Sequence, residues 1–293
     1  MKRSSGPRPV YRTVGLVAKT TSEEALRLAL SLEKALRQRH LEVCFESGTA
    51  EALERPDGVP VSRVSRVSDL TLVLGGDGTL LSVARAAPAG KPVLGINVGV
   101  LGFLAGLRRE EALTRLDEVL GGGFREDKRR RFEVRIPSGA HKGTYRALND
   151  AVLNKEALAR ISTFAISLDG RPAARFRADG IIVSTPTGST AYNLSAGGPI
   201  LHPSLAAVVV TPICPHTLTQ RPLVVPAATR IGLSILDRGR TDGVYLTLDG
   251  QEGFPITRDC SVEVRPASSP VTLLRPPESD HFDKLAEKLN WGL

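Results

Sequence analysis

The chain has 293 residues, which is long enough for one large domain or two moderate ones, each with its own hydrophobic core. Hydrophobic residues make up 41% and charged residues 24%, a balance that is typical of a folded globular protein and argues against disorder. The net charge of +8 indicates an anionic partner, but only 4% of residues are aromatic. Because single-strand binders stack bases on aromatic side chains, nucleotide phosphates explain the charge at least as well as nucleic acid does.

The cysteines and the apolar stretches indicate in which cellular compartment the protein is found. Cys44, Cys214 and Cys260 are odd in number and far apart, so we expect reduced core residues and no disulfide or zinc framework. The N-terminus lacks a signal-type apolar core, and the apolar stretches fall well short of the roughly 20 residues of a membrane helix. These features predict a cytoplasmic protein with no membrane partner.

The first part of the chain alternates predicted strands and helices. Residues 1–12 read as a flexible basic arm, and residues 13–18 as a strand. Residues 21–24 match a capping box, which precedes a helix with one apolar face. The remaining elements of this part are predicted strands at residues 41–45, 70–74 and 92–97 and a predicted helix at 113–120. This alternation predicts an α/β domain over residues 13–126, with a parallel sheet covered on both faces and ligands at the carboxyl ends of its strands.

A glycine turn at residues 75–79, Gly-Gly-Asp-Gly-Thr, follows the predicted strand at 70–74. Glycines there let an anion approach the backbone N–H groups at a helix start. Since a carboxylate would repel phosphate, Asp77 needs another reason to be present: it binds a metal or accepts a proton from an attacking hydroxyl. The alternative is that Asp77 only caps the helix. The spacing fits neither a dinucleotide fingerprint nor a P-loop.

After three glycines at 121–123, the pattern changes to short strand-like runs. Residues 127–270 are predicted to be mostly β, with Asp-Gly turns at 169–170 and 249–250. The basic cluster at residues 128–131 is predicted to be a solvated surface, with contact to donor phosphate as the alternative. In the last segment, 271–293, helical spacing of Phe282, Leu285, Ala286 and Leu289 predicts a helix that docks back on the first domain.

Residues 179–199 begin as a buried strand and continue as a dense run of hydroxyl and small side chains. Neutral donors and acceptors on a tight backbone can bind a base or a sugar without the desolvation cost of charge, which favours a nucleoside pocket. The alternative is a structural loop followed by a small-residue helix. Asn149 and Asp150 stand directly before an apolar run, and an amide beside a carboxylate suits the two hydroxyls of a ribose.

Five segments of the chain resemble bacterial NAD kinases, which use ATP or polyphosphate. They are the glycine turn at 75–79, Asn149 and Asp150, the run at 179–199, and residues 215–223 and 288–291. The resemblance runs from about residue 13 to the end, and its most specific part is the run through Thr-Gly-Ser-Thr-Ala-Tyr at 187–192. It implies an N-terminal α/β nucleotide-binding domain, a C-terminal β-sandwich, and transfer of a phosphoryl group to the 2′-hydroxyl of the adenosine ribose of NAD, giving NADP. Such an enzyme is a transferase that requires Mg²⁺ or another divalent cation, and a homodimer or homotetramer is expected, with no nucleic-acid partner.

The resemblance also implies residue roles. Asp77 is expected to be the general base, and the expected substrate-binding residues are Asp77, Gly78, Asn149, Asp150, Arg160, Arg177, Asp179, Thr190, Ala191, Tyr192, Asn193, Leu194, Ser195 and Gln251. Asp150 stands where many family members carry Glu, and Val98 where a basic or polar residue is common. His216 is at least as well explained by a structural hydrogen bond as by a ligand contact.

Two other functions fit parts of the pattern. A lipid kinase of the diacylglycerol type shares the glycine turn and the two-domain plan, but its acceptor needs an apolar pocket, whereas residues 184–195 offer hydroxyls. A basic nucleic-acid-binding protein fits the net charge, and its affinity should fall steeply with salt.

Overall fold

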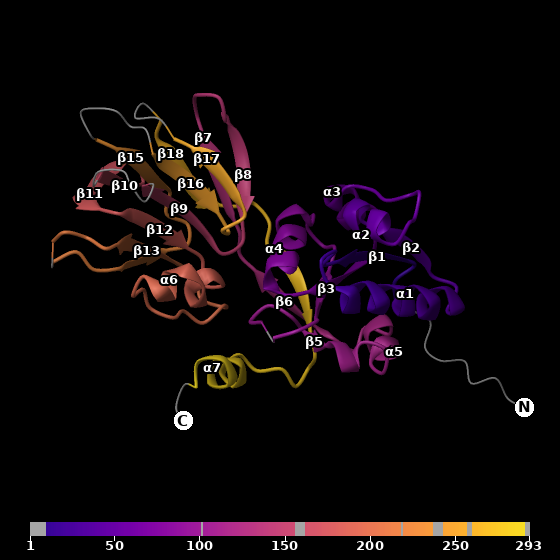
Figure 1. The fold of residues 1–293 in the computed structure, drawn as a ribbon. Helices are drawn as coiled ribbons and strands as arrows, with labels where there is room; N and C mark the ends of the chain where they lie inside the picture. The colour runs from indigo at the N-terminus through magenta and orange to yellow at the C-terminus, as the bar shows by residue number, and fades with distance from the viewer. Residues whose placement is uncertain are drawn as a thin grey trace, which may run out of the picture. The chain divides into compact units, whose positions relative to one another are not determined.

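The computed structural model describes residues 10–100, 102–155, 162–217, 219–236, 243–256 and 260–290. The chain forms two compact units, the first made of residues 1–128 and 271–293 and the second of residues 129–270 (Figure 1). Within the described residues, no helix combines the length and the apolar character needed to cross a membrane.

The first unit is built on a seven-stranded sheet with the order β2-β1-β3-β4-β19-β6, in which β5 also pairs with β4. Its strands are β1 (Thr13–Ala18), β2 (Glu42–Phe45), β3 (Leu70–Gly75), β4 (Val93–Asn97), β5 (Leu107–Arg108), β6 (Arg125–Arg129) and β19 (Val271–Arg275). The pairs among β1 to β5, and the pair of β19 with β4, are parallel. The predicted parallel α/β fold is therefore confirmed.

Helices cover both faces of this sheet, which explains why the central strands β1, β3 and β4 are apolar and buried along nearly their whole length. The helices are α1 (Glu23–Gln38), α2 (Ser47–Ala52), α3 (Val61–Val67), α4 (Asp77–Ala86), α5 (Leu116–Leu120), α7 (His281–Leu289) and the short 3₁₀ helix η1 (Arg109–Glu111). The apolar faces of α1 and α5 share one core with Leu70, Leu72 and Leu74 of β3. Figure 1 shows α3 and α4 on the opposite side of the sheet from α1 and α5.

Three local predictions for this unit need correction. Ser22, rather than Thr21, caps α1, and its hydroxyl accepts from the N–H of Ala25, so no Glu completes a capping box. The predicted helix at 113–120 begins only at Leu116, and Leu113 is exposed. Helix α7 is present, but of its predicted apolar face only Leu285 is buried.

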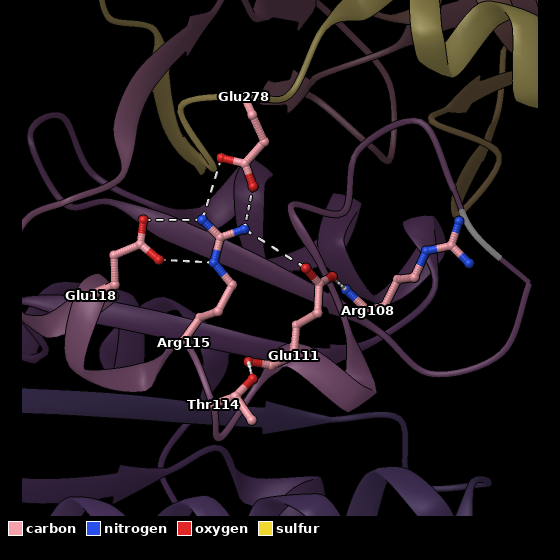
Figure 2. A network of polar contacts seen from close by, with 6 residues as sticks. All are labelled: Arg108, Glu111, Thr114, Arg115, Glu118 and Glu278. Atoms are coloured by element: carbon pink, nitrogen blue, oxygen red, sulfur yellow. Dashed lines mark hydrogen bonds and ion pairs between the residues drawn. The ribbon is translucent and has the colours of Figure 1, made fainter.

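Charged contacts connect the C-terminal segment to the rest of the first unit (Figure 2). The Arg115 guanidinium binds both carboxylate oxygens of Glu118, at 2.8 and 3.0 Å, and both of Glu278. Glu111 adds a third carboxylate at 3.7 Å, and the guanidinium stacks over the ring of Phe124 at 5.0 Å. Hydrogen bonds to Glu118 and Glu278 raise the pKa of Arg115 above its ordinary value. Arg115 thus ties the segment before α7 to α5.

The second unit is a sandwich of two six-stranded sheets, in the orders β11-β10-β15-β18-β7-β8 and β14-β13-β12-β9-β16-β17. The strands of the first of these sheets are β7 (Phe132–Ile136), β8 (Gly143–Ala147), β10 (Ser162–Leu168), β11 (Arg171–Ala178), β15 (Ile231–Ile235) and β18 (Val262–Pro266). Those of the other are β9 (Asp150–Lys155), β12 (Gly180–Ser184), β13 (Ala207–Ile213), β14 (Leu223–Pro226), β16 (Val244–Leu248) and β17 (Glu252–Pro255). Alternate residues of both sheets fill a single core between them, which confirms the predicted β-sandwich.

Both predicted Asp-Gly turns join antiparallel strands. Asp169 and Gly170 have φ values of 49° and 80° between β10 and β11, and Asp249 and Gly250 have values of 51° and 65° between β16 and β17. Asp and Gly are among the residues that tolerate this left-handed region best. The 3₁₀ helix η2 (Gly188–Thr190) and α6 (Tyr192–Ser195) follow β12, and Figure 1 shows α6 beside β12 and β13.

Candidate functional site

The glycine turn of the first unit has the predicted strand–turn–helix form. β3 ends at Gly75, Gly76 occupies the N-cap position and α4 begins at Asp77. Asp77 does not cap this helix. Its Oδ2 accepts a hydrogen bond from the N–H of Phe103 at 2.8 Å, and its Oδ1 accepts one from the N–H of Leu104 at 3.1 Å. The capping alternative is therefore wrong, and the carboxylate is held across the turn by a second loop.

Gly102 lets this second loop come close to Asp77. A Cβ atom at position 102 would collide with the carboxylate group of Asp77. The two N–H donors fix the orientation of the carboxylate, while an ionised carboxylate has about four acceptor positions. Asp77 thus keeps capacity to accept a further hydrogen bond. Residues 102–104 carry no motif in the sequence that predicts this contact with Asp77.

A cavity of about 290 Å³ lies in the first unit and is lined by Glu24, Asn97, Gly99, Arg108, Arg109 and Glu110. Its arginines are already matched by carboxylates. Arg109 pairs with Glu24 and with Glu110 at 2.6 Å each, and Arg108 pairs with Glu287 at 2.7 Å. The wall is therefore close to electrically balanced, which does not favour it as a strong phosphate site.

In the second unit, Asn149 and Asp150 lie at the start of β9, between the ends of β12 and β16. Asp150 faces Ser184 in the register of β9 and β12. Thr185, which follows β12, donates its N–H to the carbonyl of Asn149 at 2.9 Å and its hydroxyl to the carbonyl of Leu148 at 2.6 Å. Thr185 of the hydroxyl-rich run thus fixes the backbone carbonyl groups of Leu148 and Asn149.

Asp249 fixes the backbone N–H groups of the same segment. Its carboxylate accepts from the N–H of Leu148 at 3.0 and 3.1 Å, from that of Asn149 at 2.7 Å and from that of Asp150 at 3.1 Å. Asp249 is only 8% exposed. The sequence pattern indicated a turn at this position. It gave no sign that the side chain of its Asp organises the backbone of Asn149 and Asp150, the two residues predicted to bind ribose and called the ribose pair below.

The ribose pair has unusual electrostatics. Asp150 is 4% exposed, and burial together with the nearby charge of Asp249 raises its pKa from 3.8 to about 7. Oδ1 of Asn149 is buried and, among the described residues, has no hydrogen-bond partner. A buried acceptor without a partner is costly unless a ligand supplies a donor.

The side chain of Asn193, which is predicted to bind substrate, forms its hydrogen bonds within the protein. Its side chain is fully buried, and its Nδ2 donates to the carbonyls of Ser189 at 3.1 Å and Pro199 at 3.0 Å. Its Oδ1 accepts from the hydroxyl of Thr211 on β13 at 2.6 Å. These three bonds use both ends of the amide to hold the loop against the sheet.

The remaining predicted site residues differ in exposure. Around α6, Thr190, Ala191 and Leu194 are half-buried, whereas Tyr192 and Ser195 are exposed. Gly78 is exposed in the first turn of α4, Arg177 is exposed on β11 and Gln251 is exposed in the turn before β17. Asp179 pairs with Lys155 at 3.5 Å, a contact that sequence analysis missed. Arg160 lies outside the described residues. Ligand binding by these residues stays a prediction.

Part of the basic cluster at 128–131 is not a solvated surface, contrary to the prediction. Arg129 is 7% exposed and donates to the hydroxyl of Thr187 at 3.3 Å. Arg131 is 2% exposed, donates to the carbonyl of Ser269 at 3.2 Å, and has its pKa lowered to about 10 by burial and by the charge of Arg146. The other two members, Lys128 and Arg130, are exposed as predicted, and Lys128 pairs with Glu126 at 3.6 Å.

The structure also places the cysteines and His216. The three cysteines are free, as predicted, but only Cys260 is buried, while Cys214 is exposed and has a φ of 45°. His216 is exposed, and its backbone N–H donates to the carbonyl of Arg177 at 3.0 Å. No group of three or more His, Cys, Asp or Glu side chains in the described part of the chain is arranged to hold a metal ion.

Comparisons with known proteins cover nearly the whole chain. The family model of the ATP-NAD kinase N-terminal domain matches residues 14–124, and that of the ATP-NAD kinase C-terminal domain matches residues 148–275. A protein named NAD kinase from Solibacter usitatus is 40% identical over 286 residues, covering 97% of this chain and 99% of the relative. One from Koribacter versatilis is 41% identical over 284 residues, covering 96% and 99%.

Solved structures agree in fold. Yeast NADH kinase, solved with NADH, superposes with a TM-score of 0.89 at 26% identity, over 97% of this chain and 88% of that one. An NAD kinase from Archaeoglobus fulgidus, solved with ATP, has a TM-score of 0.76 at 24% identity, over 95% and 98%, and supports the fold alone. With both family domains and the full-length relatives in agreement, this chain belongs to the NAD kinase family.

Proposed function

We propose that this protein phosphorylates NAD at the 2′-hydroxyl of its adenosine ribose, with ATP or another phosphoryl donor, and releases NADP. The match of both family domains across residues 14–124 and 148–275 carries the proposal. The two relatives named NAD kinase cover 97% and 96% of the chain, and the yeast relative was solved with NADH.

The ribose pair supports a sugar as the acceptor. Oδ1 of Asn149 is a buried acceptor that lacks a donor among the described residues, and a ribose hydroxyl would supply one. Asp150 is buried beside it, with a pKa of about 7, so near neutral pH it is present both as an acceptor and as a donor to a hydroxyl. This environment suits an uncharged polar group better than a phosphate.

Asp77 is proposed as the general base. A ribose hydroxyl is a poor nucleophile at neutral pH, and a positioned carboxylate that takes its proton contributes ~10²–10⁴-fold to the rate. The N–H groups of Phe103 and Leu104 orient the carboxylate while leaving it acceptor capacity for that proton. Alignment of donor and acceptor supplies the larger part of catalysis in phosphoryl transfer.

We also propose that the reaction uses Mg²⁺. Mg²⁺ commonly takes one or two carboxylates from the protein and the rest of its ligands from substrate phosphates and water. Ligands supplied by the donor phosphates and by water would hold the ion without occupying the Asp77 carboxylate, which stays available for the hydroxyl proton. Bound with the donor phosphates, Mg²⁺ would offset their negative charge.

The proposal is tested by incubating the protein with NAD, Mg²⁺ and ATP, or with polyphosphate in place of ATP, and measuring NADP enzymatically. Formation of NADP with at least one donor is the expected result. Diacylglycerol replaces NAD in a parallel reaction, and phosphorylation of that lipid without NADP formation would overturn the proposal in favour of a lipid kinase. We also propose that the protein is a homodimer or a homotetramer. Size-exclusion chromatography with light scattering tests this assembly.

A further inference from the structure

One peptide group of the first unit connects Asp77 to two cations from the end of the chain. The peptide that joins Phe103 to Leu104 donates its N–H to Oδ1 of Asp77 at 3.1 Å. The carbonyl oxygen of the same peptide accepts from Nη2 of Arg275 at 3.1 Å and from Nζ of Lys284 at 3.5 Å. A carboxylate and two cations thus lie at opposite ends of a single peptide dipole.

The next carbonyl strengthens the same arrangement. The oxygen of Ala105 accepts from Nη1 of Arg275 and from Nζ of Lys284, each at 2.6 Å. Four hydrogen bonds from two cations therefore hold the short segment that carries both N–H donors to Asp77. Cations at the carbonyl end polarise a peptide and strengthen the bond that its N–H donates, particularly where water is excluded.

We propose that Lys284 and Arg275 are positioning residues for Asp77, acting through the peptide between Phe103 and Leu104. The inference rests on the proposed role of Asp77 in phosphoryl transfer. It assigns helix α7 a task near the reacting atoms: Lys284 keeps the loop at 102–105 in the one conformation that presents its N–H groups to the carboxylate.

The packing of α7 supports this assignment. Of the large apolar residues on this helix, only Leu285 is buried, while Phe282 is 55% and Leu289 37% exposed. Described contacts of α7 with the rest of the first unit include the bonds of Lys284 to the two carbonyls and the pair of Glu287 with Arg108. A helix placed chiefly for packing would bury more of its apolar face.

Lys284 is the better position to test, because the Arg275 side chain is 3% exposed and pairs with Asp127 at 3.2 Å, so its loss would also disturb the core. The test variants are Lys284→Met, which keeps the length and loses the charge, and Lys284→Arg, which keeps the charge. Lys288→Met removes the other lysine of the same helix and is the matched control.

Two measurements are made on the full-length protein. Hydrogen exchange at the amides of Phe103 and Leu104, followed by mass spectrometry on overlapping peptides, is expected to be at least tenfold faster in Lys284→Met than in the wild type or in Lys288→Met. For NADP formation, kcat is expected to fall between about tenfold and about 100-fold in Lys284→Met, the scale expected when a catalytic group is misplaced from a distance. The KM for NAD is expected to change less than threefold, and Lys284→Arg to recover most of the turnover.

The outcomes separate this inference from the proposed function. If the wild type makes no NADP, the proposed function fails, while the exchange rates still report whether Lys284 orders the loop. If the wild type is active but Lys284→Met matches Lys288→Met in kcat and in amide exchange, the positioning role is refuted. A fall in melting temperature of Lys284→Met with unchanged kcat would also refute it, since that is the signature of a purely structural contact.

Discussion

Asp249 offers the sharpest test of how the ribose pair is held. Its carboxylate is the acceptor for three successive backbone N–H groups, at Leu148, Asn149 and Asp150. In Asp249→Ala these donors, two of them buried and that of Asn149 partly buried, lose their partner, at about 1–3 kcal/mol each. The φ of 51° adds about 1 kcal/mol for alanine. We therefore expect Asp249→Ala to lower the free energy of unfolding by about 4 kcal/mol or more.

Asp249→Asn is expected to behave differently. The Oδ1 atom alone accepts from all three N–H groups, so an amide oxygen in its place keeps those bonds, and asparagine tolerates the left-handed conformation. The expected loss of stability is within about 1.5 kcal/mol. Because the negative charge beside Asp150 is removed, the pKa of Asp150 should also fall from about 7.

The assay is urea unfolding of both variants at pH 7, with the KM for NAD measured in parallel. Asp169→Ala is a matched control, because Asp169 has a φ of 49° in the other Asp-Gly turn but is exposed and accepts only one described bond, from the N–H of Arg230 at 3.0 Å. We expect that control to lose no more than about 2 kcal/mol. Equal losses in Asp249→Asn and Asp249→Ala, or a loss in Asp249→Ala no larger than in Asp169→Ala, would show that the Asp249 carboxylate does not hold this backbone segment through the three bonds.

Four further results are expected. Asp77→Asn should keep the affinity for NAD, measured by calorimetry, within about threefold but reduce kcat by ~10²-fold or more; near-normal turnover would contradict the base assignment. Asp150 has a raised pKa, so its contribution to stability is complete below about pH 3.8 and is lost as pH rises to about 7. The unfolding free energy of wild type relative to Asp150→Asn should therefore fall by at most about 4 kcal/mol between pH 4 and pH 8 in urea titrations, and a difference independent of pH would contradict this. Gly188→Ala places a Cβ against the backbone carbonyl of the ribose pair, so the KM for NAD should rise at least tenfold, whereas an unchanged KM would show that the loop can move away. Arg115→Gln removes the contacts with Glu278 drawn in Figure 2 and should cost about 1 kcal/mol at low salt, with a smaller difference at 1 M NaCl; a difference that persists at high salt would point to packing.

Local patterns in the sequence were sufficient for much of the fold. The strand, turn and helix around Asp77 follow from an apolar run, glycines and a helical period within 17 residues, β3 and α4 together. The two-residue turn at Asp169 and Gly170 is a short-range signal of the same kind. Such features depend on neighbours in the chain, and the structure confirms them.

Contacts between distant residues were not predictable in the same way. Asp249 lies about 100 residues from the backbone it organises, and Arg275 lies 172 residues from the carbonyl of Phe103. The basic cluster shows the same limit, because a run of charges predicts solvent exposure, and only the tertiary fold buries Arg129 and Arg131 among carbonyl and hydroxyl partners. An unaligned sequence does not encode such partners in any local period or spacing.

The position of β19 bears on how the protein is made. This strand comes from residues 271–275, yet it lies inside the first sheet and pairs with β4, after the chain has passed through the whole second unit. On the ribosome, the amino-terminal half therefore waits for the carboxyl-terminal segment to emerge before its sheet is complete, although domains generally fold in order of synthesis. A polypeptide that terminates before residue 271 lacks this inserted strand as well as Arg275 and Lys284, so only products that extend beyond Lys284 contain all the residues that hold the loop beside Asp77.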